Sequence, residues 1–517
     1  MAASFGLYFG NTNLCLAIHK DGNTEAVTND SGDRVTPAVI AFSNGEKSVG
    51  LAAKSEMARN PGGTICHLKS LLTATSPDEV QQLASDSPCK VVAEGDQVLY
   101  EVCSADDKRG TRHSRSDVLL YLFRKMFEVA ESQGSDEYPA VLTVPPEFGE
   151  EQRRLVAEAA TKAGFQVLRL INEPTAAALA YHMGSPPSPE VCRYLLYRLG
   201  GRTASASVVA VCNGAYRLVA HAIAQPALGG RDFTAAVVDH CAQEFKRQSR
   251  GADLRESRRA LARLWTAAET AKHVLATLET AQCFAESVYE GMDLSLNLSR
   301  ARFESLLGPL LSRCAEPIDE ALRQAGLEAS DIHKVVVCGG STKVRRVRGL
   351  LASRFPSSQM LDSHSPDEVI ALGAAMQAAL LSSRRESVRE VPRHVQVPAL
   401  ARSIYVKTGA EGSLTEVLGR GTPVPARWQQ AVARVDGESS VMVEVYEGGG
   451  DSVQDATLLA RVCMHSLEEE SKLMASVSIR SDGSVHVSCT DKHKSLTESV
   501  TLDATTSTAA ESDSSES

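Results

Sequence analysis

Glycine turns recur along the chain at points where the backbone could bind phosphate. The stretch YRLGGRTAS (197–205) reads as a strand that runs into a glycine pair, and three further glycine turns have polar neighbours. Backbone N–H groups in such turns point at phosphate oxygens, and the missing Cβ lets the chain approach closely. These turns and their neighbours form the candidate phosphate-binding set: Gly10, Asn11, Thr12, Gly200, Gly201, Arg202, Thr203, Gly229, Gly230, Gly339, Gly340 and Ser341.

Two arginines flank the glycine pair of this stretch. Arg198 stands just before the pair and Arg202 just after it. A guanidinium group binds phosphate through a fork of N–H donors, so these side chains could hold a phosphate directly. They could instead bridge two lobes through carboxylates and leave the cleft without a nucleotide. The sequence leaves both interpretations open.

The elements that would position these turns alternate between strands and helices as far as residue 382. AVLTVP (140–145) predicts a buried strand, EEQRRLVAEAATKAG (150–164) predicts a helix, and Pro174 opens a later helix. Such alternation predicts an α/β fold. The strand–turn–strand plan near residue 10 is repeated near residue 200, which predicts a duplicated fold with a cleft between two lobes. The alternative is coincidence, because glycine turns often follow strands.

The character of the chain changes after this first predicted domain, residues 1–382. Residues 383–398 are charged and punctuated by proline, and they predict a linker. Residues 399–501 contain runs such as SVMVEVYEGG that alternate with period two, and they predict a small β-sandwich domain. Residues 502–517 have low complexity and predict a disordered tail.

Composition narrows the function classes. The 517 residues carry a formal net charge of −10 and 12 cysteines, none in a CxxC pair. This indicates free thiols in a reducing compartment and argues against a generally nucleic-acid-coating surface. No run approaches the roughly 18 apolar residues of a membrane span. We therefore expect a cytosolic protein without a membrane partner. The basic runs at 255–263 and 343–348 could contact RNA directly, although such runs are more often solvated helix faces.

Several motifs, in order, resemble those of the seventy-kilodalton heat-shock protein (Hsp70) family. They are NDSGDRVTPAVIAF (29–42), LINEPTAAALAY (170–181), ALGGRDF (227–233), VVVCGGSTKVRRV (335–347) and SPDEVIALGAAMQAAL (365–380). The resemblance implies an α/β, two-lobed, actin-like ATPase domain with ATP as its ligand. The later block resembles the family's peptide-binding β-sandwich through GTPVPAR and VMVEVYEGG. We expect it to be truncated, without the family's helical lid.

The resemblance also assigns roles to residues of the predicted cleft. Lys69 matches the family's phosphate-facing lysine, and Glu173 matches its carboxylate near the metal and the attacking water. Glu269 and Lys272 match ribose contacts, three residues apart on one helix face. Asp367 matches a residue that helps to close the cleft.

The residues that depart from the family pattern are concentrated where the family binds Mg²⁺. Tyr8 and Arg198 stand where the family places two aspartates that organise hydrated Mg²⁺. Hydrolysis of a γ-phosphate needs a metal and an oriented water. The exchange removes two negative charges and adds one positive charge, so we expect Mg²⁺ to be held poorly and hydrolysis to be weak or absent, with no catalytic residue. The other departures are Asn11, Arg202, Ser205 and His273, the last at the position of an arginine that stacks on adenine.

The altered cleft, linker and β domain most closely resemble the atypical, ribosome-associated members of the family. That resemblance implies a stable heterodimer with a J-domain co-chaperone, and work on nascent polypeptides beside the ribosome. Two alternatives stay open. One is an active ATP-hydrolysing foldase in which Lys69 and Glu173 carry the reaction. The other is a small-molecule kinase, because sugar kinases share the same fold.

Overall fold

The chain divides into two compact units, Met1–Val391 and Pro392–Ser517, which are described separately. The computed structural model describes residues 3–43, 45–74, 76–85, 87–95, 97–103, 110–183, 190–212, 215–249, 251, 253–387, 400, 402–408, 414–419, 422, 426–432, 440–448, 456–465, 473–480, 484–491, 493 and 496–502. No described helix is both long enough and apolar enough to span a membrane.

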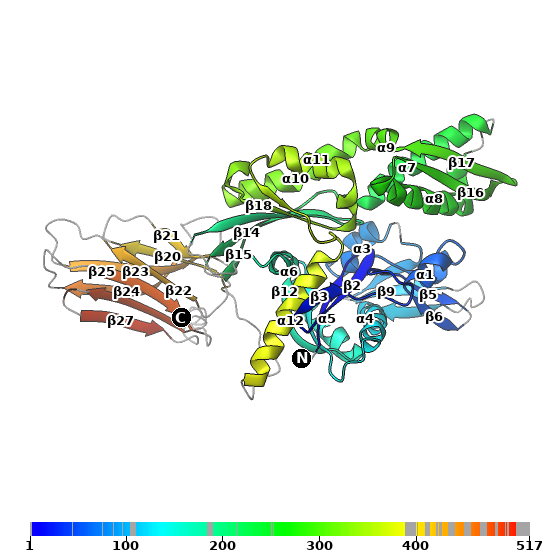
Figure 1. The fold of residues 1–517 in the computed structure, drawn as a ribbon. Coiled ribbons are helices and arrows are strands. Elements are labelled where there is room, and N and C mark those ends of the chain that lie inside the picture. The colour runs from blue at the N-terminus through cyan, green and yellow to red at the C-terminus, as the bar shows by residue number, and fades with distance from the viewer. Residues whose placement is uncertain are drawn as a thin grey trace, which may run out of the picture. The chain divides into compact units, whose positions relative to one another are not determined.

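The first lobe of the first unit is built on a six-stranded sheet (Figure 1). Strands β1 and β2 form an antiparallel hairpin, and β11 and β12 then extend the sheet from β1 in parallel. The strand order is β12 (Gln166–Asn172), β11 (Pro139–Val144), β1 (Ser4–Phe9), β2 (Asn13–Lys20) and β3 (Asn23–Ala26), with β4 (Thr36–Pro37) pairing to β2. The strand predicted at 140–145 is thus β11, and its side chains are buried throughout.

The second lobe repeats this plan. Its five strands are β15 (Ala215–Ile223), β14 (Ala204–Cys212), β13 (Cys192–Leu199), β18 (Lys334–Cys338) and β19 (Gln359–Leu361), in that spatial order. Here β13, β14 and β15 form an antiparallel meander, and β18 and β19 extend the sheet from β13 in parallel. The repeated order confirms the predicted two-lobed α/β fold. It also places the turns after β1 and β13 at equivalent positions.

Further elements surround each sheet. Those of the first lobe are β5 (Ile40–Ser43), β6 (Glu46–Val49), α1 (Leu51–Glu56), β7 (Thr64–Ile65), α2 (Leu68–Leu71), α3 (Pro77–Leu83), β8 (Lys90–Glu94), β9 (Gln97–Val102), β10 (Thr111–Ser114), α4 (Arg115–Glu131) and α5 (Glu150–Ala163). Those of the second are α7 (Gly230–Gln248), α8 (Arg258–Thr277), β16 (Thr280–Tyr289), β17 (Met292–Ser299), α9 (Arg300–Leu306), α10 (Gly308–Ala325) and α11 (Arg345–Arg354). Helix α5 ends at Gly164, as the sequence predicts.

Two small-residue helices join the lobes. Helix α12 (Val369–Ser387) packs on β1, β2 and β11 of the first sheet. Helix α6 (Glu173–Ala180) contacts strands of both sheets, and the two helices pack on each other. Their backbones touch, because a Cβ added to Gly373 would lie 1.7 Å from the Ala176 carbonyl oxygen. This close crossing fixes helix α6, whose first residue is Glu173, where the two lobes meet (Figure 1).

Helix α12 extends into the segment that the sequence predicts to be a linker. The helix continues to Ser387, so the first residues of the 383–398 segment are helical, and positions 388–399 lie outside the described residues. The local reason is that the segment has no glycine or proline before Pro392 to end the helix.

The second unit contains two four-stranded antiparallel sheets, which agrees with the predicted β-sandwich. Its core is formed by alternating aliphatic side chains, among them Val443, Val445, Val477 and Val487. The strands are β20 (Ser403–Thr408), β21 (Thr415–Leu418), β22 (Ala426–Val432), β23 (Ser440–Gly448), β24 (Thr457–His465), β25 (Leu473–Ile479), β26 (Val485–Asp491) and β27 (Leu496–Leu502). The predicted tail after residue 502 and most of the GTPVPAR turn lie outside the described residues.

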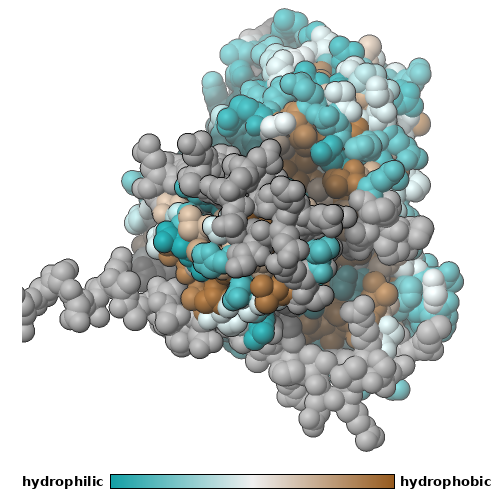
Figure 2. Space-filling model, turned by 90° about the vertical axis from the view of Figure 1, so that its left-hand side faces the viewer, coloured by the Kyte–Doolittle hydropathy of each residue, from teal (hydrophilic) through white to brown (hydrophobic). Residues whose placement is uncertain are grey.

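The surface mixes residue types. Figure 2 shows hydrophobic residues in small groups among hydrophilic ones on one face of the molecule.

All twelve cysteines lie within the described residues as free thiols. Most of them, including Cys241, Cys283 and Cys338, are buried.

Candidate functional site

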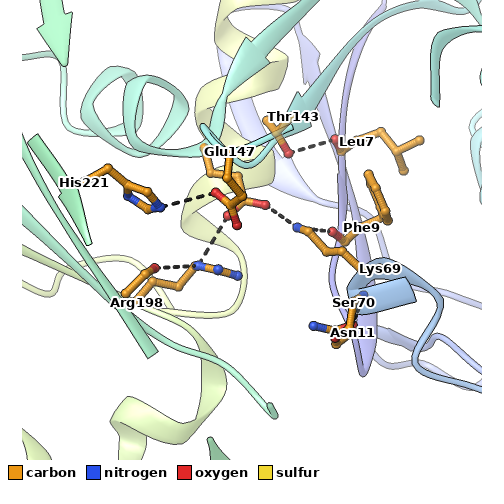
Figure 3. A network of polar contacts seen from close by, with 11 residues as sticks. Leu7, Phe9, Asn11, Lys69, Ser70, Thr143, Glu147, Arg198 and His221 are labelled. Atoms are coloured by element: carbon orange, nitrogen blue, oxygen red, sulfur yellow. Dashed lines mark hydrogen bonds and ion pairs between the residues drawn. The ribbon is translucent and has the colours of Figure 1, made fainter. Parts of the chain in front are cut away.

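A buried ion cluster links the two lobes. Glu173 accepts through Oε1 from the Nζ of Lys69 on α2, and its Oε2 lies 3.3 Å from the Nε of Arg198 on β13. The side chains of Lys69, Glu173 and Arg198 are only 4%, 2% and 7% exposed. Lys69 and Arg198 approach from opposite sides (Figure 3). One carboxylate therefore links the two lobes through two cations.

Lys69 is held by more than this carboxylate. Its Nζ donates to the Phe9 carbonyl oxygen at 2.8 Å and lies 4.8 and 5.0 Å from the ring centres of Phe9 and Tyr8. Burial lowers the pKa of the Lys69 ammonium, and the Glu173 carboxylate partly offsets this effect. The charge of Lys69 is therefore turned toward Glu173 and the end of β1, and its contact with phosphate stays a prediction.

Three substituted positions meet around the Arg198 guanidinium. Ser205 faces Arg198 directly in the β13–β14 register, and its Oγ accepts from Arg198 Nε at 3.3 Å. Tyr8 also hydrogen-bonds to Arg198. Burial lowers the pKa of Arg198, but the Glu173 carboxylate and Tyr8 outweigh it and raise the pKa above its usual value. The phenol stays neutral because burial raises the pKa of Tyr8 well above its usual value. The substitutions at 8, 198 and 205 are therefore mutually compatible.

A second polar contact joins the lobes nearby and was missed in the sequence analysis. Glu147, which follows β11, lies 3.2 Å from the Nε2 of His221 on β15. Ser207 holds the other ring nitrogen, with 2.8 Å between its Oγ and Nδ1. Burial acts to raise the pKa of Glu147, but His221 overrides it and lowers the pKa to about 2. No local pattern around either residue could have revealed this pair, because they lie on different lobes.

The glycine turns of the two lobes touch each other. A Cβ added to Gly201 would lie 2.3 Å from the Thr12 Cγ2, so only glycine fits at this contact. Gly230 N donates to the Gly200 carbonyl oxygen at 2.9 Å. The Ser341 Oγ donates to the same oxygen at 2.9 Å. The structure therefore gathers four predicted phosphate-binding segments, which come from distant parts of the chain, around one backbone position.

Neighbouring predicted residues hold these turns in place. The Asn11 Oδ1 accepts from both the N and the Oγ of Ser70 at 2.8 Å, which fixes the first turn to α2. Gly10 N donates to the Asn13 carbonyl oxygen, and Gly200 N donates to the Thr203 carbonyl oxygen, closing the two hairpins. The backbone of Arg202 packs on Gly229, where an added Cβ would lie 2.4 Å from the Arg202 N.

The third turn lies at the end of β18. Gly339 has a φ of +87°, and an added Cβ would lie 2.3 Å from the Leu199 carbonyl oxygen, so both conformation and space require glycine. Gly340 follows it and begins a short 3₁₀ helix. Asp367 lies close by, with its Oδ2 2.7 Å from the Lys343 Nζ. Burial opposes ionisation of Asp367, but Lys343 and Ser365 lower its pKa. The carboxylate expected to help close the cleft is thus paired.

The predicted ribose contacts lie on α8. The Lys272 Nζ donates to the Gly230 carbonyl oxygen at 2.9 Å and to the Thr234 Oγ1 at 2.8 Å, and burial lowers its pKa to about 8. Glu269 lies 3.3 Å from the Lys54 Nζ of the first lobe. Desolvation and the Lys272 charge lower the pKa of the nearby His273 to about 4. The ring of His273 is therefore neutral at pH 7, unlike the arginine that it replaces.

These residues suit a nucleotide better than a divalent metal. The hydroxyls of the turns and the cations of the site match phosphate and sugar, whereas the N–H groups of Gly10, Gly200 and Gly230 donate within the chain. Magnesium needs oxygen ligands, usually one or two carboxylates. Both oxygens of Glu173 already face cations, and Asp367 is paired with Lys343. In the described part of the chain, no three His, Cys, Asp or Glu side chains are grouped to hold a metal. The residues present do not fit a magnesium site.

The comparisons with known proteins agree with this architecture. The "Hsp70 protein" family matches residues 4–516, which span both units, and the chain belongs to this family. It is thus a chaperone-family protein with an actin-like, ATP-binding domain. A small-molecule kinase does not account for a match that includes the β-sandwich.

More particularly, the chain is similar over its whole length to proteins named "Heat shock 70 kDa protein 14". It is 40% identical to that of Bos taurus over 512 residues, 97% of this chain and 99% of the relative. The identity is 39% over 511 residues for Homo sapiens, with the same two shares. It is 38% over 512 residues for Xenopus tropicalis, 97% of this chain and all of the relative.

Proposed function

We propose that this protein is a chaperone component that binds ATP and hydrolyses little or none of it. It pairs stably with a J-domain co-chaperone and assists nascent polypeptides at the ribosome, in the cytosol. One observation carries the proposal on hydrolysis: Glu173, the carboxylate expected to orient the metal and the water, is held between Lys69 and Arg198. A carboxylate neutralised by two cations of its own chain is a poor base for water.

The local electrostatics support this reading. Hydrolysis needs charge neutralised along the phosphate oxygens and a water aligned for attack. By the family resemblance, Arg198 and Tyr8 stand at the positions of two metal-organising carboxylates, and here they supply a guanidinium paired with Glu173 and a neutral phenol. The backbone turns that would hold phosphate are kept, together with Lys272 and Glu269. Binding is therefore supported more strongly than cleavage.

The partner proposal rests on the resemblance and on the β unit. The described β unit is a compact sandwich with its own core, and a sheet edge of this kind can accept an extended chain by strand addition. Contact between an extended client and such a sheet edge alone would be shallow and fast. Such a component would depend on a partner for slow, driven cycles, which favours stable pairing with a J-domain protein.

The test combines binding and turnover on the purified full-length chain. We expect saturable ATP binding with steady-state hydrolysis at the background rate, both alone and with a J-domain protein. Isolation from cytosol should bring ribosomes and a J-domain protein with the chain. Robust Mg²⁺-dependent turnover that a J-domain stimulates would contradict the proposal and favour the active foldase. In that case, a Glu173→Ala variant should abolish the turnover.

A further inference from the structure

We propose that the Arg198 guanidinium replaces the divalent cation of the cleft, so that a nucleoside triphosphate binds here in its metal-free form. This inference rests on the proposed nucleotide binding and names the chemical form of the ligand. The observation behind it is the misfit between the residues of the cleft centre and magnesium.

The guanidinium group of Arg198 is buried and held by several side-chain contacts. Arg198 is buried on a central strand, contacts Glu173 and Ser205 through Nε, and hydrogen-bonds to Tyr8. Its strand ends one residue later and leads into the Gly200–Gly201 turn. A fixed positive charge therefore lies directly at the base of a predicted phosphate loop. An arginine side chain stays protonated at every physiological pH, so it supplies this positive charge without an ion from solution.

Charge counting separates the two ligand forms. Lys69 and Arg198 contribute two positive charges, and Glu173 and the neighbouring Glu147 contribute two negative charges, so these four groups balance. Lys272 adds another cation beside Gly230. A magnesium ion brought next to this cluster would meet the charges of Lys69 and Arg198, and it would find both oxygens of Glu173 facing these cations. A triphosphate without a metal would meet attraction from the same groups.

The ion pairs that link the two lobes also support binding of the metal-free nucleotide. In a metal-dependent site, a bound cation draws carboxylates from both sides of the cleft together. Here Arg198 of the second lobe already holds Glu173, which Lys69 holds from the first lobe. The Glu147–His221 pair adds a second link between the lobes. The chain thus supplies from its own side chains the link that a metal would otherwise provide.

Calorimetric titration of the full-length protein with ATP tests the inference. The titration is run in EDTA and again with excess Mg²⁺. We expect ATP to bind at least tenfold more weakly in excess Mg²⁺ than in EDTA, because Mg²⁺ holds ATP in solution and must be released before the metal-free form can bind. An affinity that is equal in the two buffers, or lower in EDTA, would overturn the inference while leaving the proposed nucleotide binding intact. No binding in either buffer would overturn both.

Variants of two arginines on strand β13 test whether the charge of Arg198 is responsible. Arg198→Asp creates a pair of carboxylates with Glu173, and we expect Mg²⁺ to raise its ATP affinity at least tenfold. Arg193→Asp makes the same change near the start of β13, away from the cluster, and should bind ATP like the wild-type chain in both buffers. Arg198→Lys keeps a buried cation and should retain binding in EDTA, which covers the case in which the aspartate variant does not fold. Binding in EDTA that is equal in Arg198→Asp and wild type would refute the role of this charge.

Discussion

Replacing Glu173 by glutamine should destabilise the first unit more than removing either cation. Glu173 is the only negative charge among the three buried side chains, and it faces both Lys69 and Arg198. Glu173→Gln leaves two buried cations facing a neutral amide, so their mutual repulsion is no longer balanced. Arg198→Met instead leaves Lys69 and Glu173 as a balanced pair. Glu173→Gln therefore raises the summed charge of these three positions from +1 to +2, whereas Arg198→Met lowers it to zero.

The size of the effect follows from the contact distances. At 3.3 Å the Arg198–Glu173 attraction is about 5 kcal/mol at an effective dielectric constant of about 20, before desolvation is subtracted. Removing one partner of a buried pair typically costs about 3–5 kcal/mol because the other charge stays buried. We expect Glu173→Gln to lie in or above that range and Arg198→Met to cost less than about 2 kcal/mol. Adding Arg198→Met to Glu173→Gln should restore about 1–2 kcal/mol.

The assay uses the two tryptophans of the chain. Trp265 lies in the first unit on α8, with Arg231 over its ring at 4.7 Å, and Trp428 lies in the second unit on β22. A Trp428→Phe background therefore leaves fluorescence that reports the first unit alone during urea unfolding. The reasoning is refuted if Glu173→Gln is no less stable than Arg198→Met. It also fails if the double variant is less stable than Glu173→Gln.

Three further predictions concern packing, hydrogen bonding and pH. Gly373→Ala should destabilise by more than about 3 kcal/mol in thermal unfolding, because its Cβ would meet the Ala176 oxygen at 1.7 Å, whereas Gly349→Ala, with open space, should be neutral or slightly stabilising. Asn11→Ala should cost about 1–2 kcal/mol, and Asn11→Asp much less, since only Oδ1 accepts from Ser70. The pKa of Lys272 is about 8 in the folded chain against an ordinary 10.5, so the unfolded state binds more protons in between. The free energy of unfolding of the wild-type chain should therefore rise by about 3 kcal/mol from pH 8 to 10.5, relative to that of Lys272→Met, in urea unfolding. If the gap between the two chains is the same at both pH values, the burial assigned to Lys272 is wrong.

Local pattern was enough to predict the elements that carry the glycine turns. Strand β11, the end of α5 at Gly164 and the opening of α6 with Pro174 follow from apolar runs and helix signals. The end of α12 was harder, because residues 383–387 carry neither a stop signal nor a clear period. Elements with strong local signals were therefore predictable, and a boundary without one was not.

The sequence alone determined the family, the glycine turns and the change of charge at positions 8 and 198, because each depends only on residue types in order. Only the tertiary structure decided what Arg198 contacts. Its partner Glu173 and the missed pair Glu147–His221 come from separate segments, and their approach depends on how α6 and the two sheets pack. A side chain's partner in a cleft is set by long-range packing, which local residue patterns do not encode.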